Sequence, residues 1–231
     1  GVSVELPDGI VTNEQDLAAL RTYHYGSPDI VESPAEWFEF DVSMGAITGF
    51  YYEPGRENVV IPWEIGGVPV TAIGDSAFEE SGIVSVIAPQ TVTVIGDDAF
   101  SYCNLLTSVS LPQATAIGGG AFYGCGIVSV IAPQATSIGN YAFYYCTALA
   151  SVTIPQAQTV GAYAFFYCNL LTSVSLPQAQ TVGACAFDSC SRLASVNLPQ
   201  ATAIGDYAFS DCDSLASVSL PQATAIGDYA F

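Results

Sequence analysis

Cysteine is the residue type with the most chemistry available in this chain, and its spacing limits what that chemistry can be. Six of the seven cysteines hold one place, three residues after a phenylalanine: Cys103, Cys125, Cys146, Cys168, Cys190 and Cys212. Side chains that recur at one place in stacked units point in parallel, which suits close packing better than the torsion angle of a disulfide. We therefore predict a structural ladder of buried free thiols, with disulfides or a metal site as the alternatives.

The seventh cysteine, Cys185, stands two residues before a phenylalanine, where other units carry tyrosine. Tyr141, Tyr163, Tyr207 and Tyr229 hold the equivalent places. We expect Cys185 to be the most exposed thiol and the first to react with a labelling reagent. A simple replacement of tyrosine also accounts for this residue.

Nucleophilic catalysis needs a base beside the nucleophile, and the sequence offers little of this kind. His24 is the single histidine, and the recurring serines are identical with one another and have no distinctive partner. Acidic pairs such as Glu79-Glu80 and Asp97-Asp98 could serve as general acids or calcium ligands, but acids in such pairs are usually a solvated face. We expect no catalytic residue, no metal site and no cofactor.

The elements that position these residues follow from a 22-residue repeat. Phenylalanine recurs at 22-residue intervals with one interval of 21, at Phe78, Phe100, Phe122, Phe143, Phe165, Phe187, Phe209 and Phe231. Proline keeps nearly the same period between Pro62 and Pro221. Self-similarity at this period is typical of a solenoid, in which each unit buries its apolar face against its neighbours.

One unit shows how the repeat is built. In the segment 106–112, Val109 and Leu111 share one face of a strand and Ser108 and Ser110 share the other. A second short extended piece at 114–117 leads to a glycine that suits a corner. The spacing from Phe to Cys then predicts a short helical turn on the other side of the coil.

The repeat array and the segment before it differ in character. We expect residues 1–58 to form an N-terminal cap, with a short helix from Thr12 to Leu20 and a hairpin made by 38–42 and 47–51. Residues 59–231 form about eight 22-residue units, with a Gly-Gly turn inserted at Gly66-Gly67. The last unit is incomplete, so we expect either that the natural chain continues or that this end makes an end-to-end contact.

Charge argues against several classes of partner. The formal net charge is -19, with 22 acidic residues and only Arg21, Arg56 and Arg192 as strong bases. Such a surface repels phosphate backbones and anionic lipid, which argues against nucleic-acid binding. No stretch has the roughly 20 unbroken apolar residues of a membrane helix, so we expect no membrane insertion. The sequence also opens without a recognisable signal peptide.

The motif Leu-x-x-Val-x-Leu-Pro followed by Ile-Gly-x-x-Ala-Phe-x-x-Cys resembles the BspA-like branch of leucine-rich-repeat proteins. The resemblance runs from about Phe38 to Phe231. It departs from the general leucine-rich pattern because alanine, as at Ala114, holds the usual Asn or Cys position. The resemblance implies an α/β-class right-handed solenoid, rich in β-structure, with a parallel strand ladder. It also implies a secreted or cell-surface bacterial protein that binds extracellular protein or glycan as an adhesin does, with neither catalytic residues nor cofactors.

Two surfaces are candidates for binding. The middle units place aromatic residues directly after the repeated phenylalanine, where flanking units carry acids or small polar groups: Tyr123, Tyr144, Tyr145, Phe166 and Tyr167. Either these side chains form an exposed patch or they pack under the next coil as core. The rival surface is the polar face of the strands: Ser151, Thr153, Ser173, Ser175 and Asn197. The monotony of the repeats also fits a structural spacer, and the aromatic residues also fit a carbohydrate-binding module.

Overall fold

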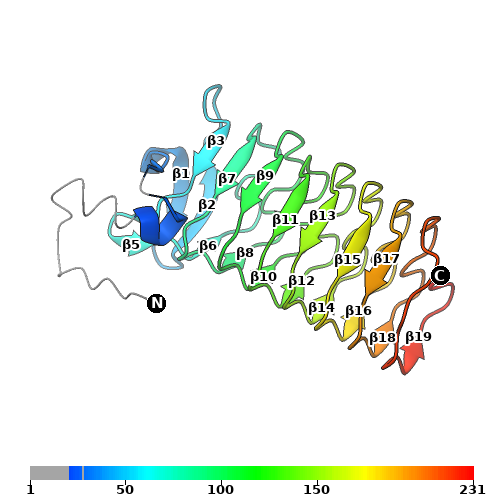
Figure 1. Cartoon of the computed structure of the whole chain (residues 1–231). Coiled ribbons are helices and arrows are strands. Elements are labelled where there is room, and N and C mark those ends of the chain that lie inside the picture. The colour runs from blue at the N-terminus through cyan, green and yellow to red at the C-terminus, as the bar shows by residue number, and fades with distance from the viewer. Residues whose placement is uncertain (1–20, 28) are drawn as a thin grey trace.

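A computed structural model describes residues 21–27 and 29–231, and it shows an elongated stack of coils (Figure 1). A one-turn helical segment at 21–25 and the 3-10 helix η1 (Ala35–Trp37) precede the array. The helix expected at 12–20 lies outside the described residues.

The predicted N-terminal hairpin is confirmed. Strand β1 (Phe38–Asp41) pairs antiparallel with β2 (Ala46–Phe50), and β2 pairs parallel with the first coil at β6 (Ala72–Ile73). The hairpin therefore covers the open face of the first coil, as the end of a solenoid requires. The inserted turn also forms, because β4 (Glu64–Ile65) and β5 (Val68–Pro69) pair antiparallel around two glycines with positive φ.

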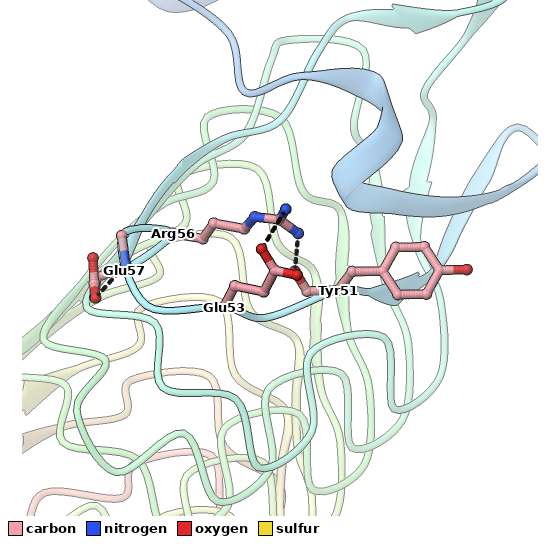
Figure 2. Close-up of polar contacts among 5 residues, drawn as sticks. Tyr51, Glu53, Arg56 and Glu57 are labelled. Carbon is pink, nitrogen blue, oxygen red and sulfur yellow. Dashed lines mark hydrogen bonds and ion pairs between the residues drawn. The ribbon is translucent and has the colours of Figure 1, made fainter.

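A loop at 51–57 joins this hairpin to the array (Figure 2). The Arg56 guanidinium donates to the Tyr51 carbonyl at 2.6 Å, pairs with the Glu53 carboxylate at 2.8 Å, and lies 5.0 Å from the centre of the Trp37 ring. Glu57 accepts from the Gly55 N–H at 2.9 Å. These contacts fix the loop against the cap.

Each coil except the last contributes one three-residue strand to one side of the stack (Figure 1). These strands are β3 (Asn58–Val60), β7 (Ser85–Ile87), β9 (Ser108–Ser110), β11 (Ser129–Ile131), β13 (Ser151–Thr153), β15 (Ser173–Ser175) and β17 (Ser195–Asn197). Their parallel pairing falls into three separate sheets, β3-β7-β9, β11-β13 and β15-β17. On this side the strand ladder is interrupted twice.

The unbroken ladder is formed by the second, shorter extended piece of each coil. After β6 it runs through β8 (Val94–Ile95), β10 (Ala116–Ile117), β12 (Ser137–Ile138), β14 (Thr159–Val160), β16 (Thr181–Val182), β18 (Ala203–Ile204) and β19 (Ala225–Ile226). With β1 and β2 these strands make one ten-stranded sheet, and all pairs after β2 are parallel. The predicted parallel solenoid is therefore confirmed, with its longest ladder in these two-residue strands.

The core is built from the repeated columns. The phenylalanine rings stack along the axis with centroids 5.0–5.4 Å apart, and those from Phe78 to Phe209 are at most 2% exposed. The predicted apolar strand positions are buried through most of the array, whereas the serine and glutamine columns lie at or near the surface. Each unit thus buries its apolar face against the next.

The expected short helical turns are not helices. In residues 58–231 the chain after each glycine forms successive hydrogen-bonded turns, such as Cys103 N–H to Phe100 O at 3.1 Å. A helix cannot continue here, because the residues two before and two after each phenylalanine have positive φ, for example Tyr141 at 60° and Tyr145 at 57°.

The cysteine ladder is confirmed as buried free thiols. Each thiol donates to the carbonyl of the phenylalanine in the preceding coil, as from Cys125 to Phe100 at 2.9 Å and from Cys190 to Phe165 at 3.1 Å. The thiols therefore contribute hydrogen bonds between neighbouring coils.

Cys185 is the most exposed thiol jointly with Cys212, as the sequence suggested, but it is not a surface group. Cys185 is buried at 9% exposure, and Cys212 at the last complete turn has the same value. The reason is the length of its neighbours in the column, since the short thiol lies between the longer rings of Tyr163 and Tyr207.

Candidate binding surface

The aromatic residues of the middle units occupy three adjacent columns on the turns. One column directly follows the core phenylalanine, a second lies one residue further on, and a third lies two residues before it. The second and third columns have positive φ throughout the array. This left-handed backbone turns their side chains away from the core, which the phenylalanine occupies.

The first column stacks its rings along the solenoid axis. Tyr123 and Tyr144 lie 4.8 Å apart at 17°, and Tyr144 and Phe166 lie 4.8 Å apart at 10°. All three side chains are half-buried. They are therefore neither core residues nor free surface groups.

The second and third columns extend this stack sideways. Tyr145 and Tyr167 stack at 4.8 Å, and Tyr141 and Tyr163 stack at 5.0 Å with an interplanar angle of 2°. Tyr144 joins the columns, since its ring centre lies 5.0 Å from Tyr145 and 5.6 Å from Tyr141. The aromatic patch, as we define it, comprises Tyr102, Tyr123, Tyr141, Tyr144, Tyr145, Tyr163, Phe166 and Tyr167.

The stacking decides which parts of these rings a ligand can reach. Where rings stack at 4.8–5.0 Å, their faces cover one another, and the edges and hydroxyl groups remain accessible. Through these edges and hydroxyl groups, Tyr145 remains 44% exposed and Tyr102 remains 46% exposed. The patch therefore presents apolar edges rimmed by hydroxyl groups.

The hydroxyl groups of Tyr123 and Tyr144 are protonated donors at neutral pH. Burial, followed by a hydrogen bond with the Tyr102 hydroxyl, raises the pKa of Tyr123 to about 12. Burial also raises the pKa of Tyr144. Donors of this kind fit carbonyl or carboxylate acceptors on a partner.

The patch is bounded by polar positions in the same columns. Asp188 follows Phe166 in the first column, and burial raises the pKa of its carboxyl. At the other end, Gly120 ends the third column, and Ser101 and Glu80 precede the first aromatic residues of the first and second columns. The aromatic patch is thus confined to the middle coils.

The strand-face residues predicted from the sequence are exposed and lie on two separately paired sheets. Ser151 and Thr153 lie on β13, which pairs with β11, whereas Ser173, Ser175 and Asn197 lie on β15 and β17 in another sheet. The Asn197 side chain donates to Ser175 Oγ at 3.1 Å. The exposed Ile131 opposite Thr153 adds an apolar side chain.

Sequence reasoning missed three members of the patch as site residues, namely Tyr102, Tyr141 and Tyr163. The signal was present, because Tyr141 and Tyr163 hold the column used to interpret Cys185. What the sequence did not show is that this column lies beside the column that follows phenylalanine. Tyr144 contacts both columns.

The turn columns and ladders match a known family. The family model described as BspA type leucine rich repeat region matches residues 71–190 and 136–231 in 6 copies. The chain belongs to the BspA-type leucine-rich-repeat family. Families of leucine-rich repeats are generally non-catalytic binding or scaffold folds.

Solved structures of leucine-rich-repeat proteins agree with this assignment. A T. pallidum leucine-rich-repeat protein is 28% identical, with 81% of this chain and 92% of that chain covered and a TM-score of 0.74. A protein of Faecalibacterium prausnitzii described as a leucine rich cell surface protein is 26% identical, with 87% and 52% covered and a TM-score of 0.61.

A third structure shows likeness of fold alone. The leucine-rich-repeat protein of Bacteroides ovatus is 24% identical, with 86% of this chain and 61% of that chain covered and a TM-score of 0.58. A search of curated protein sequences gives no significant match to the BspA-type chain.

Two further features of the described residues concern metal binding and membrane-spanning helices. No group of three or more His, Cys, Asp or Glu side chains there could hold a metal ion. Within the same residues, no helix has the length and apolar character to cross a membrane.

Proposed function

We propose that this BspA-type array is a non-enzymatic, adhesin-like module of a secreted or cell-surface protein. It binds an extracellular macromolecule through the aromatic patch. The observation that supports this proposal is the patch itself, in which eight aromatic side chains lie together over four coils. Six of them hold positions where the flanking units carry acids or small polar groups. The description of the Faecalibacterium prausnitzii structure as a cell surface protein supports the location.

Protein is a better partner than glycan for this surface. Sugars stack on the exposed face of an aromatic ring, and the stacked columns cover most of those faces. Tyrosine edges and hydroxyl groups suit a protein surface, where tyrosine provides contact area at low cost in conformational entropy. Carbohydrate capture is therefore the second candidate, with a structural spacer as the third.

A screen with two forms of the protein tests the proposal. The intact protein and the variant Tyr144→Ala, Tyr145→Ala, Tyr167→Ala are applied to immobilised extracellular-matrix proteins and glycans. We expect the intact protein to bind at least one protein surface and the variant to bind it at least about tenfold more weakly, as loss of central tyrosines does elsewhere.

Thermal melting of both forms provides the control for folding. Binding of glycans alone would favour the carbohydrate module. Equal binding by both forms would refute the patch as the site, and absence of binding by the intact protein would favour the spacer.

A further inference from the structure

The aromatic patch ends at a notch where two columns lose their side chains together. Gly119 replaces the Asp97 and Asn140 of the neighbouring coils, and Gly120 replaces Asp98 and Tyr141. The resulting recess has a volume of about 490 Å³ and is lined by these residues together with Tyr123. Among the units from Phe100 to Phe209, this is the one with glycine in both columns.

One wall of the notch carries two carboxylates with different roles. Asp97 Oδ1 accepts from the Gly119 N–H at 2.6 Å, which fixes this side chain to the next coil. The Asp98 carboxylate leans over Gly120, where a Cβ on residue 120 would collide with Oδ1. In the described part of the chain, no hydrogen-bond donor or basic side chain pairs with Asp98.

Asp98 carries an electrostatic cost that a bound cation would relieve. Partial burial, and then the negative charges of Glu79, Asp97 and Asp75, raise the pKa of its carboxyl. A cation in the notch would favour the ionised form by the opposite interaction.

The opposite wall is aromatic. One face of the Tyr141 ring is covered by Tyr163 at 5.0 Å, and the other is directed toward the coil of Gly120, which offers no ring to stack on it. Tyr123 forms a second aromatic side of the recess. An open tyrosine face near a carboxylate is a favourable place for a cationic group.

We propose that this notch binds the guanidinium group of an arginine in a basic segment of the partner protein. The planar group continues the interrupted tyrosine column by stacking on Tyr141, and its N–H donors meet the Asp98 carboxylate. The net charge of -19 favours approach of such a segment. The inference rests on the proposed function, because it names the chemical group that the partner of the aromatic patch would present.

The test follows the backbone amide signals of Gly119 and Gly120 by ¹⁵N–¹H NMR during titration with a blocked peptide, acetyl-Gly-Arg-Gly-amide. The same peptide with citrulline, the neutral isostere of arginine, is the matched ligand control. We expect saturable shifts at the two glycines with the arginine peptide and none with the citrulline peptide. Equal shifts with both peptides would overturn the proposal.

Two variants of the notch and one distant variant complete the test. Asp98→Asn should weaken peptide binding at least about tenfold. Gly120→Tyr should abolish it by filling the notch and displacing the Asp98 carboxylate. This variant should fold, because the displaced atom ends a flexible side chain and Tyr141 and Tyr163 adopt the same backbone conformation. Asp211→Asn removes an equal charge from an exposed left-handed position several coils away, and it should leave binding within about twofold.

If Asp98→Asn and Asp211→Asn weakened peptide binding equally, the notch would be refuted as the binding site, and long-range charge attraction would explain the binding. Shifts caused by Ca²⁺ but not by the arginine peptide would also overturn it. The proposed function is tested separately. Loss of macromolecule binding in the Tyr144, Tyr145 and Tyr167 variant would support it even if the notch bound no arginine.

Discussion

At the scale of single residues, the tyrosines of the turns combine surface exposure with an unfavourable backbone. All thirteen non-glycine residues with positive φ in the described chain lie in the two turn columns. A left-handed non-glycine residue costs roughly 1–2 kcal/mol. Hydrogen bonds between coils maintain the conformation, such as Tyr145 N–H to Phe166 O at 2.9 Å. The backbone, and not the side chain, therefore sets where these rings project.

A pair of substitutions at Tyr207 tests this assignment. Tyr207 has φ of 56° and is exposed outside the patch. Glycine adopts this φ without strain, so Tyr207→Gly should be more stable than Tyr207→Ala by about 1 kcal/mol in chemical denaturation. At Ser195, an exposed residue of strand β17, the alanine variant should instead be more stable than the glycine variant. Alanine more stable than glycine at both positions would contradict the assignment.

At the scale of elements, the cysteine ladder couples stability to alkaline pH. Burial raises the pKa of Cys146, Cys168 and Cys190 above the ordinary value of 9.0, and it raises the pKa of Cys212 to about 12. The folded chain therefore holds protons that the unfolded chain releases near pH 9. The stabilisation from the protonated ladder is complete below about pH 9 and declines as the pH rises toward 12.

Unfolding free energies measured from pH 7 to pH 11 test this coupling. The variant Cys168→Ala, Cys190→Ala should be less stable at pH 7 because packing is lost. Above about pH 9 its stability should fall less steeply than that of the intact protein, by up to about 1.4 kcal/mol per pH unit for each thiol removed. Parallel curves above pH 9 would show that the ladder does not control the alkaline transition.

The sequence predicted most of these elements because the residue type that recurs at each repeat position indicates whether that position is buried or exposed. A column that holds Phe or Cys in successive units must lie in the stacked interior, and the buried Phe100 and Cys146 agree. The hairpin at 38–50 was also predictable, because its alternating residues and the Gly45 turn are local signals.

The features that the sequence did not predict depend on backbone angles and on contacts between columns. The spacing of Phe122 and Cys125 fits a helix as well as a turn, and only the left-handed residues exclude the helix. The sequence left open whether the aromatic residues that follow each phenylalanine form an exposed patch or pack as core. The extension of the patch to Tyr141 and Tyr163 depends on the distance from Tyr144 to Tyr141, which no sequence period gives.

At the scale of the whole molecule, uniform coils form a continuous support, and we propose that the departures from uniformity provide recognition. The phenylalanine stack runs unbroken from Phe78 to Phe231, so the aromatic patch and the notch at Gly119-Gly120 have fixed relative positions on one rod. Pre-organised surfaces of this kind lose little conformational entropy on binding. We therefore propose that the middle coils bind the partner and that the other coils support them.

The most direct test compares two triple variants against the partner protein identified in the screen. Tyr144→Ala, Tyr145→Ala, Tyr167→Ala removes the centre of the aromatic patch, and Thr153→Ala, Ser175→Ala, Asn197→Ala removes three strand-face side chains on consecutive coils. The dissociation constant should rise at least about tenfold for the first variant and stay within about twofold for the second. A larger loss from the strand-face variant would contradict the central claim and place recognition on the strands.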